Sequence, residues 1–139
     1  MSFQVSTRGR YGLRAMLELA LHCEEGPVPL RKVAEMQDIS FKYLEQLTAD
    51  LKDAGLVQSV QGAGGGYKLA RPPSEIKLIE IMRALEGELA PVECVGSPEV
   101  CSKTRTCATR EVWSEVESAL KEIFGSRTLR DLVERQKKG

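Results

Sequence analysis

Three of the four cysteines of this 139-residue chain lie within one short segment. Cys94, Cys101 and Cys107 stand among polar residues, glycine and proline, and the segment has neither a helical nor a strand-like apolar period. A structural cysteine is normally a small buried hydrophobe on a periodic face, so packing does not explain the three together. Their type and density indicate metal ligands or redox-active thiols.

The spacing of these cysteines helps to distinguish between the metal centres that they could bind. Cys-x6-Cys-x5-Cys differs from the paired Cys-x2-Cys pattern that is typical of zinc. Wide, uneven spacing in one loop favours an iron–sulfur cluster whose irons are reached from different directions. Zinc, and three thiols without a metal, remain alternatives. Cys23 is predicted to be an ordinary core cysteine, and His22, the single histidine, a partly buried structural residue.

Composition and charge limit the class of protein. The chain holds 20 Lys+Arg and 20 Asp+Glu, so its net charge of zero does not itself indicate a nucleic-acid partner. The N-terminus lacks the apolar core of a signal peptide, and no apolar run approaches the ~18–20 residues of a membrane span. We therefore expect a cytoplasmic protein with reduced thiols and no membrane partner. No catalytic Ser/His/Asp or Cys/His arrangement is visible, so we expect no enzyme.

The residues before the cysteines predict three helices. Apolar spacing indicates a helix over 6–24, a short extended piece at 28–30 and a second helix over 31–37. Ser40 is a good N-cap for a third helix, which ends at about Ala54 with a glycine immediately after it. Two short helices on either side of a turn are typical of a helix-turn-helix.

A hairpin is predicted directly after these helices. Residues 56–61 alternate apolar and polar like a strand, 62–66 are glycine-rich, and 67–70 return as a second strand. The predicted fold is mainly α with a small two-stranded β wing, a winged helix-turn-helix over residues 1–71. In such modules the later helix enters the major groove and the hairpin tip lies along the backbone or minor groove.

The second half of the chain predicts a sensor and a dimer arm. A connecting helix is expected in 72–91, a cluster-binding loop in 92–107, and a long dimerisation helix plus a short C-terminal helix in 108–139, the last capped by Thr128. The long helix carries a wide apolar stripe with little chain left to cover it, which indicates a homodimer interface. The stripe consists of Val112, Trp113, Val116, Ala119, Leu120, Ile123 and Phe124.

Polar residues of the third helix and the glycine-rich wing are the candidate contacts to double-stranded DNA. Gln can pair bidentately with adenine, and Ser or Lys can reach base edges or phosphates. An ordinary solvated helix face and a loose hairpin turn are the alternatives, and the combination of both elements favours DNA. The predicted DNA-binding residues are Ser40, Lys42, Tyr43, Glu45, Gln46, Gln61, Gly64 and Gly65.

Nearly the whole chain resembles the IscR-like iron–sulfur regulators of bacteria. The resemblance lies in residues 9–16, 26–30, 39–47 and 55–67, and in the three-cysteine loop and the final Thr-Leu helix. The segments Tyr-Leu-Glu-Gln-Leu and Gly-Gly-Gly-Tyr together with three cysteines make it specific. The resemblance implies a homodimeric repressor or activator of iron–sulfur cluster assembly genes. It also implies a labile [2Fe–2S] cluster on Cys94, Cys101 and Cys107, with iron–sulfur assembly proteins as donors.

The same resemblance assigns roles within the third helix. Ser40 and Gln46 fall where the family reads bases of promoter operators. Glu45 falls where a carboxylate disfavours one class of site unless the cluster is present. Cluster occupancy would therefore change which sites are bound, through the loop and the start of the dimer helix.

Three positions depart from the family pattern. The first cysteine spacing is usually one residue shorter, and Gln61 replaces an arginine that enters the minor groove. Arg110 stands where the family has a histidine as fourth ligand, and a guanidinium stays protonated and cannot ligate. The fourth ligand is therefore open between Glu93, Glu99, Glu111, His22 and a group of the other subunit. The alternative function is a cluster-free regulator of cysteine or sulfur metabolism, or a sensor of thiol oxidation.

Overall fold

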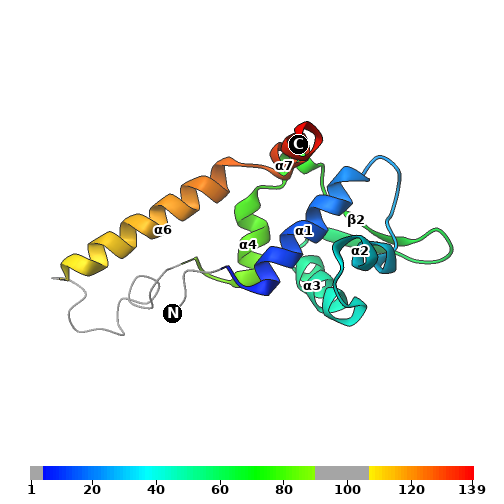
Figure 1. Ribbon diagram of the computed structural model, residues 1–139, viewed down its shortest axis with the longest axis horizontal. Helices are drawn as coiled ribbons and strands as arrows, with labels where there is room; N and C mark the ends of the chain where they lie inside the picture. The colour runs from blue at the N-terminus through cyan, green and yellow to red at the C-terminus, as the bar shows by residue number, and fades with distance from the viewer. Residues whose placement is uncertain (1–4, 90–106) are drawn as a thin grey trace.

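The computed structural model describes residues 5–89 and 107–139, so Cys94, Cys101 and Glu93 lie outside the described residues. The elements are α1 (Thr7–Leu21), α2 (Leu30–Gln37), α3 (Phe41–Asp53), β1 (Val57–Val60), β2 (Gly66–Leu69), a 3-10 turn (Pro73–Glu75), α4 (Leu78–Glu86), α6 (Ala108–Ser126) and α7 (Leu129–Lys138) (Figure 1). This mainly helical chain with one two-stranded sheet confirms the predicted fold class. None of the helices in the described ranges is long and apolar enough to cross a membrane.

Local signals set the start of α1 and both ends of α3 as the sequence predicts. The Ser6 hydroxyl accepts a hydrogen bond from the Gly9 amide at the start of α1, and the Ser40 hydroxyl does the same for Tyr43 in α3. Gly55, with a φ of 76°, follows α3 and stops it. Asp38 adopts the left-handed conformation in the turn between α2 and α3.

One hydrophobic core joins the helix-turn-helix to α4 and α7. Met16 of α1, Leu47 of α3, Ile81 of α4 and Leu129 of α7 are all 0% exposed and belong to the same cluster. Burying one such side chain is worth about 1.5–3 kcal/mol relative to leaving it in water. The placement of α3 is therefore fixed by helices that lie both before and after it in the sequence.

The wing is a short antiparallel hairpin whose base is tied to the segment before α2. Val57 pairs with Leu69 and Val60 with Gly66. Tyr67 exchanges two backbone hydrogen bonds of 2.8 Å with Val28, which lies just ahead of α2. At Gly66 any Cβ would overlap the carbonyl of Val28, so the close approach requires glycine. The wing and the start of α2 therefore form one continuous surface.

The helix α6 projects from the body as an arm (Figure 1). None of its residues is buried, and Val112 and Ile123 are 52% and 48% exposed. Its C-terminal end is attached by two backbone hydrogen bonds of 2.9 Å, from Leu78 to Arg127 and from Leu129 to Ile76. The arm is therefore attached at its root, where Phe124 packs against the core, and the described residues leave Val112 and Ile123 of its apolar stripe exposed.

One sequence expectation is wrong at the end of α1. The helix ends at Leu21 and not at residue 24, with His22 as its C-cap. Cys23 consequently lies in the turn beyond the apolar face and is exposed, so it is not a core cysteine. His22 is half-buried, as expected, and its ring lies 2.7 Å from Glu25 and 3.6 Å from Glu18.

Candidate nucleic-acid interface and cysteine segment

The polar face of α3 is presented to solvent. Lys42, Glu45 and Gln46 are exposed, whereas Leu44, Leu47, Leu51 and Thr48 on the other side are buried. The Thr48 hydroxyl donates to the carbonyl of Leu44 on the buried side of the helix. It therefore takes no part in the exposed face that carries the predicted contacts. The structure therefore brings three predicted DNA-binding side chains together on one surface. Ser40 begins this face, and its hydroxyl can still donate outward while it caps the helix.

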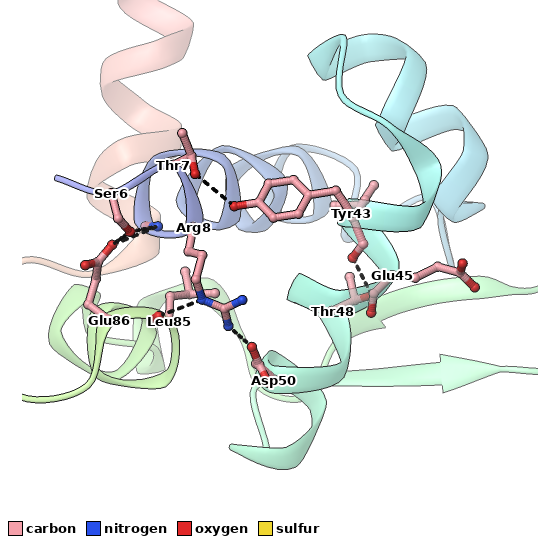
Figure 2. Close-up of polar contacts among 11 residues, drawn as sticks. Ser6, Thr7, Arg8, Tyr43, Glu45, Thr48, Asp50, Leu85 and Glu86 are labelled. Atoms are coloured by element: carbon pink, nitrogen blue, oxygen red, sulfur yellow. Dashed lines mark hydrogen bonds and ion pairs between the residues drawn. The ribbon is translucent and has the colours of Figure 1, made fainter.

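Tyr43 is placed differently from its neighbours on α3. Its hydroxyl lies 3.1 Å from the Thr7 hydroxyl of α1 (Figure 2), and its ring meets Tyr11 edge-on at 6.4 Å. The side chain is half-buried between the two helices. Tyr43 therefore holds α3 against α1, in addition to any contact that its exposed edge could make.

The predicted wing residues lie at the hairpin tip. Gln61 and Gly64 are exposed, Gly65 is half-buried, and Gly64 has a φ of 77°. A side chain at Gly65 would overlap the carbonyl of Val60, so the tight turn excludes one. Figure 1 shows the wing loop at the end of the molecule opposite to α6, beyond α2 and α3. The predicted wing and α3 contacts thus share the end of the molecule remote from the arm.

The sequence reasoning missed a basic pair at the start of α2. Arg31 and Lys32 are exposed, and the Arg31 guanidinium lies 5.1 Å from the ring centre of Phe41, the first residue of α3. Across the described part of the chain, Arg31, Lys32, Lys42 and Lys68 form no ion pair. The signal that could have found them is the pair of adjacent basic residues that follows Pro29 and Leu30.

Several other cations of the described residues are instead paired within the fold. Arg8 pairs with Asp50 and Arg71 with Glu80, while Lys121 and Arg130 pair with glutamates one turn away. Although the net charge is zero, some cations are therefore held in ion pairs within the fold and others are not. The cations around the start of α2 and α3 remain available to an anionic partner, which is the requirement for contacts to DNA phosphates.

Cys107 is the one predicted ligand that the described residues contain. It is the N-cap of α6, is half-buried, and its sulfur lies 2.9 Å from the Thr109 hydroxyl. Arg110 follows in the first turn of α6, at the position where the resembling family has its histidine. Within the described ranges, no three His, Cys, Asp or Glu side chains are grouped so as to hold a metal. The thiol suits one cluster ligand by its chemistry.

Two of the open fourth-ligand candidates can be placed. Glu111 is exposed in the first turn of α6, four residues after Cys107, so the two lie on the same side of the helix. His22 lies at the end of α1, and Figure 1 places this end far from the tip of α6. His22 therefore does not join Cys107 within one protomer. Glu99 lies outside the described residues.

Comparisons with known proteins agree over nearly the whole chain. A family model named Rrf2, described as an iron-dependent transcriptional regulator, matches residues 5–135. The transcriptional regulator CymR of Bacillus subtilis is 44% identical over 130 residues, which cover 94% of this chain and 89% of that protein. The regulator IscR of Xenorhabdus nematophila is 40% identical over 133 residues, covering 96% and 80%.

Solved structures of the same two kinds of protein share the fold. The structure of CymR, the global cysteine regulator of B. subtilis, matches with a TM-score of 0.82 and 42% identity over 96% of this chain and 98% of that chain. The structure of T. potens IscR matches with a TM-score of 0.80 and 44% identity over 98% and 90%. These relatives are named as transcriptional regulators, in keeping with the absence of a predicted catalytic site. The chain therefore belongs to the Rrf2 family of DNA-binding transcriptional regulators.

Proposed function

We propose that this regulator binds promoter operators as a homodimer and senses iron–sulfur status through a [2Fe–2S] cluster, controlling iron–sulfur cluster biogenesis genes. The observation that carries its DNA-binding part is the exposed polar face of α3 beside a wing and cations that form no ion pair within the described chain. Gln46 would read adenine, Ser40 and Lys42 would reach base edges or phosphates, and Glu45 would disfavour one class of site. Gln61, Gly64 and Gly65 would approach the minor groove or backbone.

Reading of bases by Gln46 can be tested directly. Gln46→Ala should cost about 1–3 kcal/mol on an operator duplex selected with the wild-type protein, and should relax the preference at one base pair. Binding is measured by fluorescence anisotropy on the selected duplex and on single-base variants of it. Lys52→Ala, at the last turn of the same helix with its amine 3.2 Å from Ser59, is the matched control. A uniform loss on all duplexes would show that Gln46 contacts no base.

The cluster part of the proposal rests on the three cysteines and on the similarity to IscR. Cys94, Cys101 and Cys107 would hold the cluster through their thiolates, and cluster gain or loss would supply an iron- and oxygen-dependent signal. Arg110 would not complete the site, so Glu93, Glu99, Glu111 and a group of the other subunit remain the candidates. Cluster assembly proteins would be the donors.

The second candidate is a cluster-free regulator of cysteine metabolism or a sensor of thiol oxidation. The 44% identity to CymR favours it as directly as the 40% identity to IscR favours the first. Purification without oxygen, followed by a visible spectrum and iron and sulfide analysis, separates the two. A coloured protein that loses its iron on Cys107→Ala supports the cluster. A colourless, iron-free protein that binds its operator supports the second candidate.

The link between cluster and DNA needs its own measurement. A ligand shifts DNA binding only if it has different affinities for the two DNA-binding states. The anaerobically reconstituted protein and its cluster-free form should therefore differ in affinity for at least one class of operator. Equal affinities on every selected duplex would exclude the proposed sensing.

A further inference from the structure

The first turn of α1 lies between the reading helix α3 and the C-terminal end of α4. Figure 2 shows Ser6, Thr7 and Arg8 reaching in different directions from this turn. Thr7 contacts Tyr43 near the start of α3, whereas Arg8 reaches Asp50 further along the same helix. The turn thus holds α3 at two points that lie two helical turns apart.

Arg8 joins α3 to α4 through two sides of one guanidinium. Its Nη2 forms an ion pair with the carboxylate of Asp50, and its Nε donates to the backbone carbonyl of Leu85 at 3.2 Å (Figure 2). The last carbonyls of a helix lack partners within that helix, so a cation is favourable there. Arginine suits this position because its planar fork donates in two fixed directions, which a lysine ammonium does not reproduce.

A second set of contacts ties the same turn to the next residue of α4. Glu86 accepts hydrogen bonds from the Ser6 hydroxyl and, at 2.9 Å, from the Gly9 amide. A Cβ at Gly9 would overlap the Glu86 carboxylate, and one at Gly12 would overlap the side chain of Leu85. The Leu85 and Glu86 side chains therefore pack directly against the backbone of α1, which couples the position of the end of α4 to α1.

We propose that Arg8 is a positioning residue that couples the end of α4 to the reading helix, so that a displacement of α4 changes how α3 is presented to DNA. This inference rests on the proposed reading of DNA by α3. The end of α4 is a natural input because α4 contacts α6 and because the chain continues from it toward the cysteine segment. Leu85 and Arg8 then form a physical link between that input and Asp50.

The test compares the specificity of DNA binding, not affinity alone. Specificity is the ratio of the dissociation constants for a scrambled duplex and for an operator duplex selected with wild-type protein. Arg8→Gln should lower this ratio about tenfold, because α3 loses its fixed placement while non-specific contacts remain. Arg83→Gln removes the same charge from the exposed side of α4 and should leave the ratio within about twofold.

A variant with the charges of residues 8 and 50 exchanged separates the two contacts of Arg8, with Asp50 and with the Leu85 carbonyl. Arg8→Asp combined with Asp50→Arg restores an ion pair between α1 and α3, but an aspartate at position 8 cannot donate to the Leu85 carbonyl. We expect this variant to regain the wild-type melting temperature and to keep the reduced specificity ratio. Thermal unfolding of every variant shows whether a loss of specificity is a loss of fold.

The outcomes distinguish the coupling from the proposed function. A wild-type protein that does not prefer its selected duplex to the scrambled one overturns DNA reading itself. A normal specificity ratio in Arg8→Gln, with wild-type discrimination intact, overturns the positioning role. Full recovery of specificity in the exchanged pair would show that Arg8 acts through Asp50 alone, which overturns the link to α4.

Discussion

The winged body and the α6 arm use apolar residues in opposite ways. In the body, Met16, Leu44 and Ile81 are 0% exposed and are shared between helices that are distant in sequence. The 19 residues of α6 include none that is buried. Most of the stability of a helix in a protein comes from the packing of its apolar face, so the exposed part of this stripe favours a partner surface. The body therefore completes its own core, whereas α6 keeps part of its stripe exposed within the described residues, which suits the dimer interface that the sequence predicts.

The largest effect should come from the body. Leu47→Ala leaves a cavity under α3 and should lower the free energy of unfolding by about 2–5 kcal/mol. Val112→Ala in the exposed stripe of α6 should change it by less than about 0.5 kcal/mol in the monomer. Urea titration of both variants at low protein concentration measures the contrast. Equal losses would mean that α6 is covered within its own protomer.

Disruption of the arm should act on assembly more than on folding. Ile123→Glu puts a charge into the exposed stripe, and burying it in an interface would be costly. We expect a sedimentation mass near 15.4 kDa instead of about twice that, with the body still folded. Glu122→Gln, the exposed neighbour on the same helix, is the control. A dimer that survives Ile123→Glu would move the interface to another surface.

A smaller effect is expected at the start of α2. Arg31→Gln should weaken binding to all duplexes by a similar factor and lower the slope of log affinity against log salt by about 0.9, because one phosphate contact is lost. Phe41→Leu removes the ring beneath the guanidinium and should give part of that loss. Arg130→Gln in α7 is the control, because it removes the same charge from a cation that is paired with Glu134. An unchanged salt slope in Arg31→Gln would exclude the phosphate contact.

The smallest effect concerns acid stability of the body near α4. Burial raises the pKa of Glu80, but hydrogen bonds from Arg71 and the Lys77 amide, with the charges of both residues, outweigh it and lower the pKa below its ordinary value. A lowered folded-state pKa stabilises the protein above the unfolded pKa, and this contribution is lost as pH falls through the folded value. Glu80 is partly exposed, so the contribution is at most about 0.5 kcal/mol.

Glu80→Gln should accordingly reduce stability slightly at pH 7 and flatten the loss of stability on acidification. Thermal melting of the variant and the wild type between neutral and acidic pH measures the difference. Glu75→Gln, an exposed neighbour, should follow the wild-type curve. A variant that melts like the wild type at pH 7 and diverges only in acid would reverse the assigned sign.

Local features of this chain could be predicted from sequence, whereas contacts between distant residues could not. Ser40 as a cap, Gly55 as a stop and the glycine-rich wing follow from short-range backbone chemistry. Cys23 was misplaced because helical periodicity does not fix the last turn of a helix, and α1 ends at Leu21.

The contacts of Arg8 are an example of contacts between distant residues that the sequence does not predict. They join residues 8, 50 and 85, and no spacing in the sequence relates these positions. Within the described residues Arg31 and Lys32 form no ion pair, and this likewise depends on which acids the fold brings near them. The number of charges along the chain therefore does not indicate which cations stay available at the start of α2. The ligand role of Cys94, Cys101 and Cys107, and the domain limits, stay predictions.

The attachment of α6 has a mechanical consequence. Backbone hydrogen bonds at Arg127 and Leu129 clamp one end of a 19-residue helix, and Cys107 lies at the other end. At 1.5 Å per residue the helix is about 28 Å long, so a rotation of about 5° at its root moves its tip by roughly 2.5 Å. The helix is therefore a lever in which angstrom-scale changes around Cys107 correspond to small rotations at the clamp. A chemical change at Cys107 that moves the tip of α6 would therefore act on the body as a small rotation at the attached end of the helix.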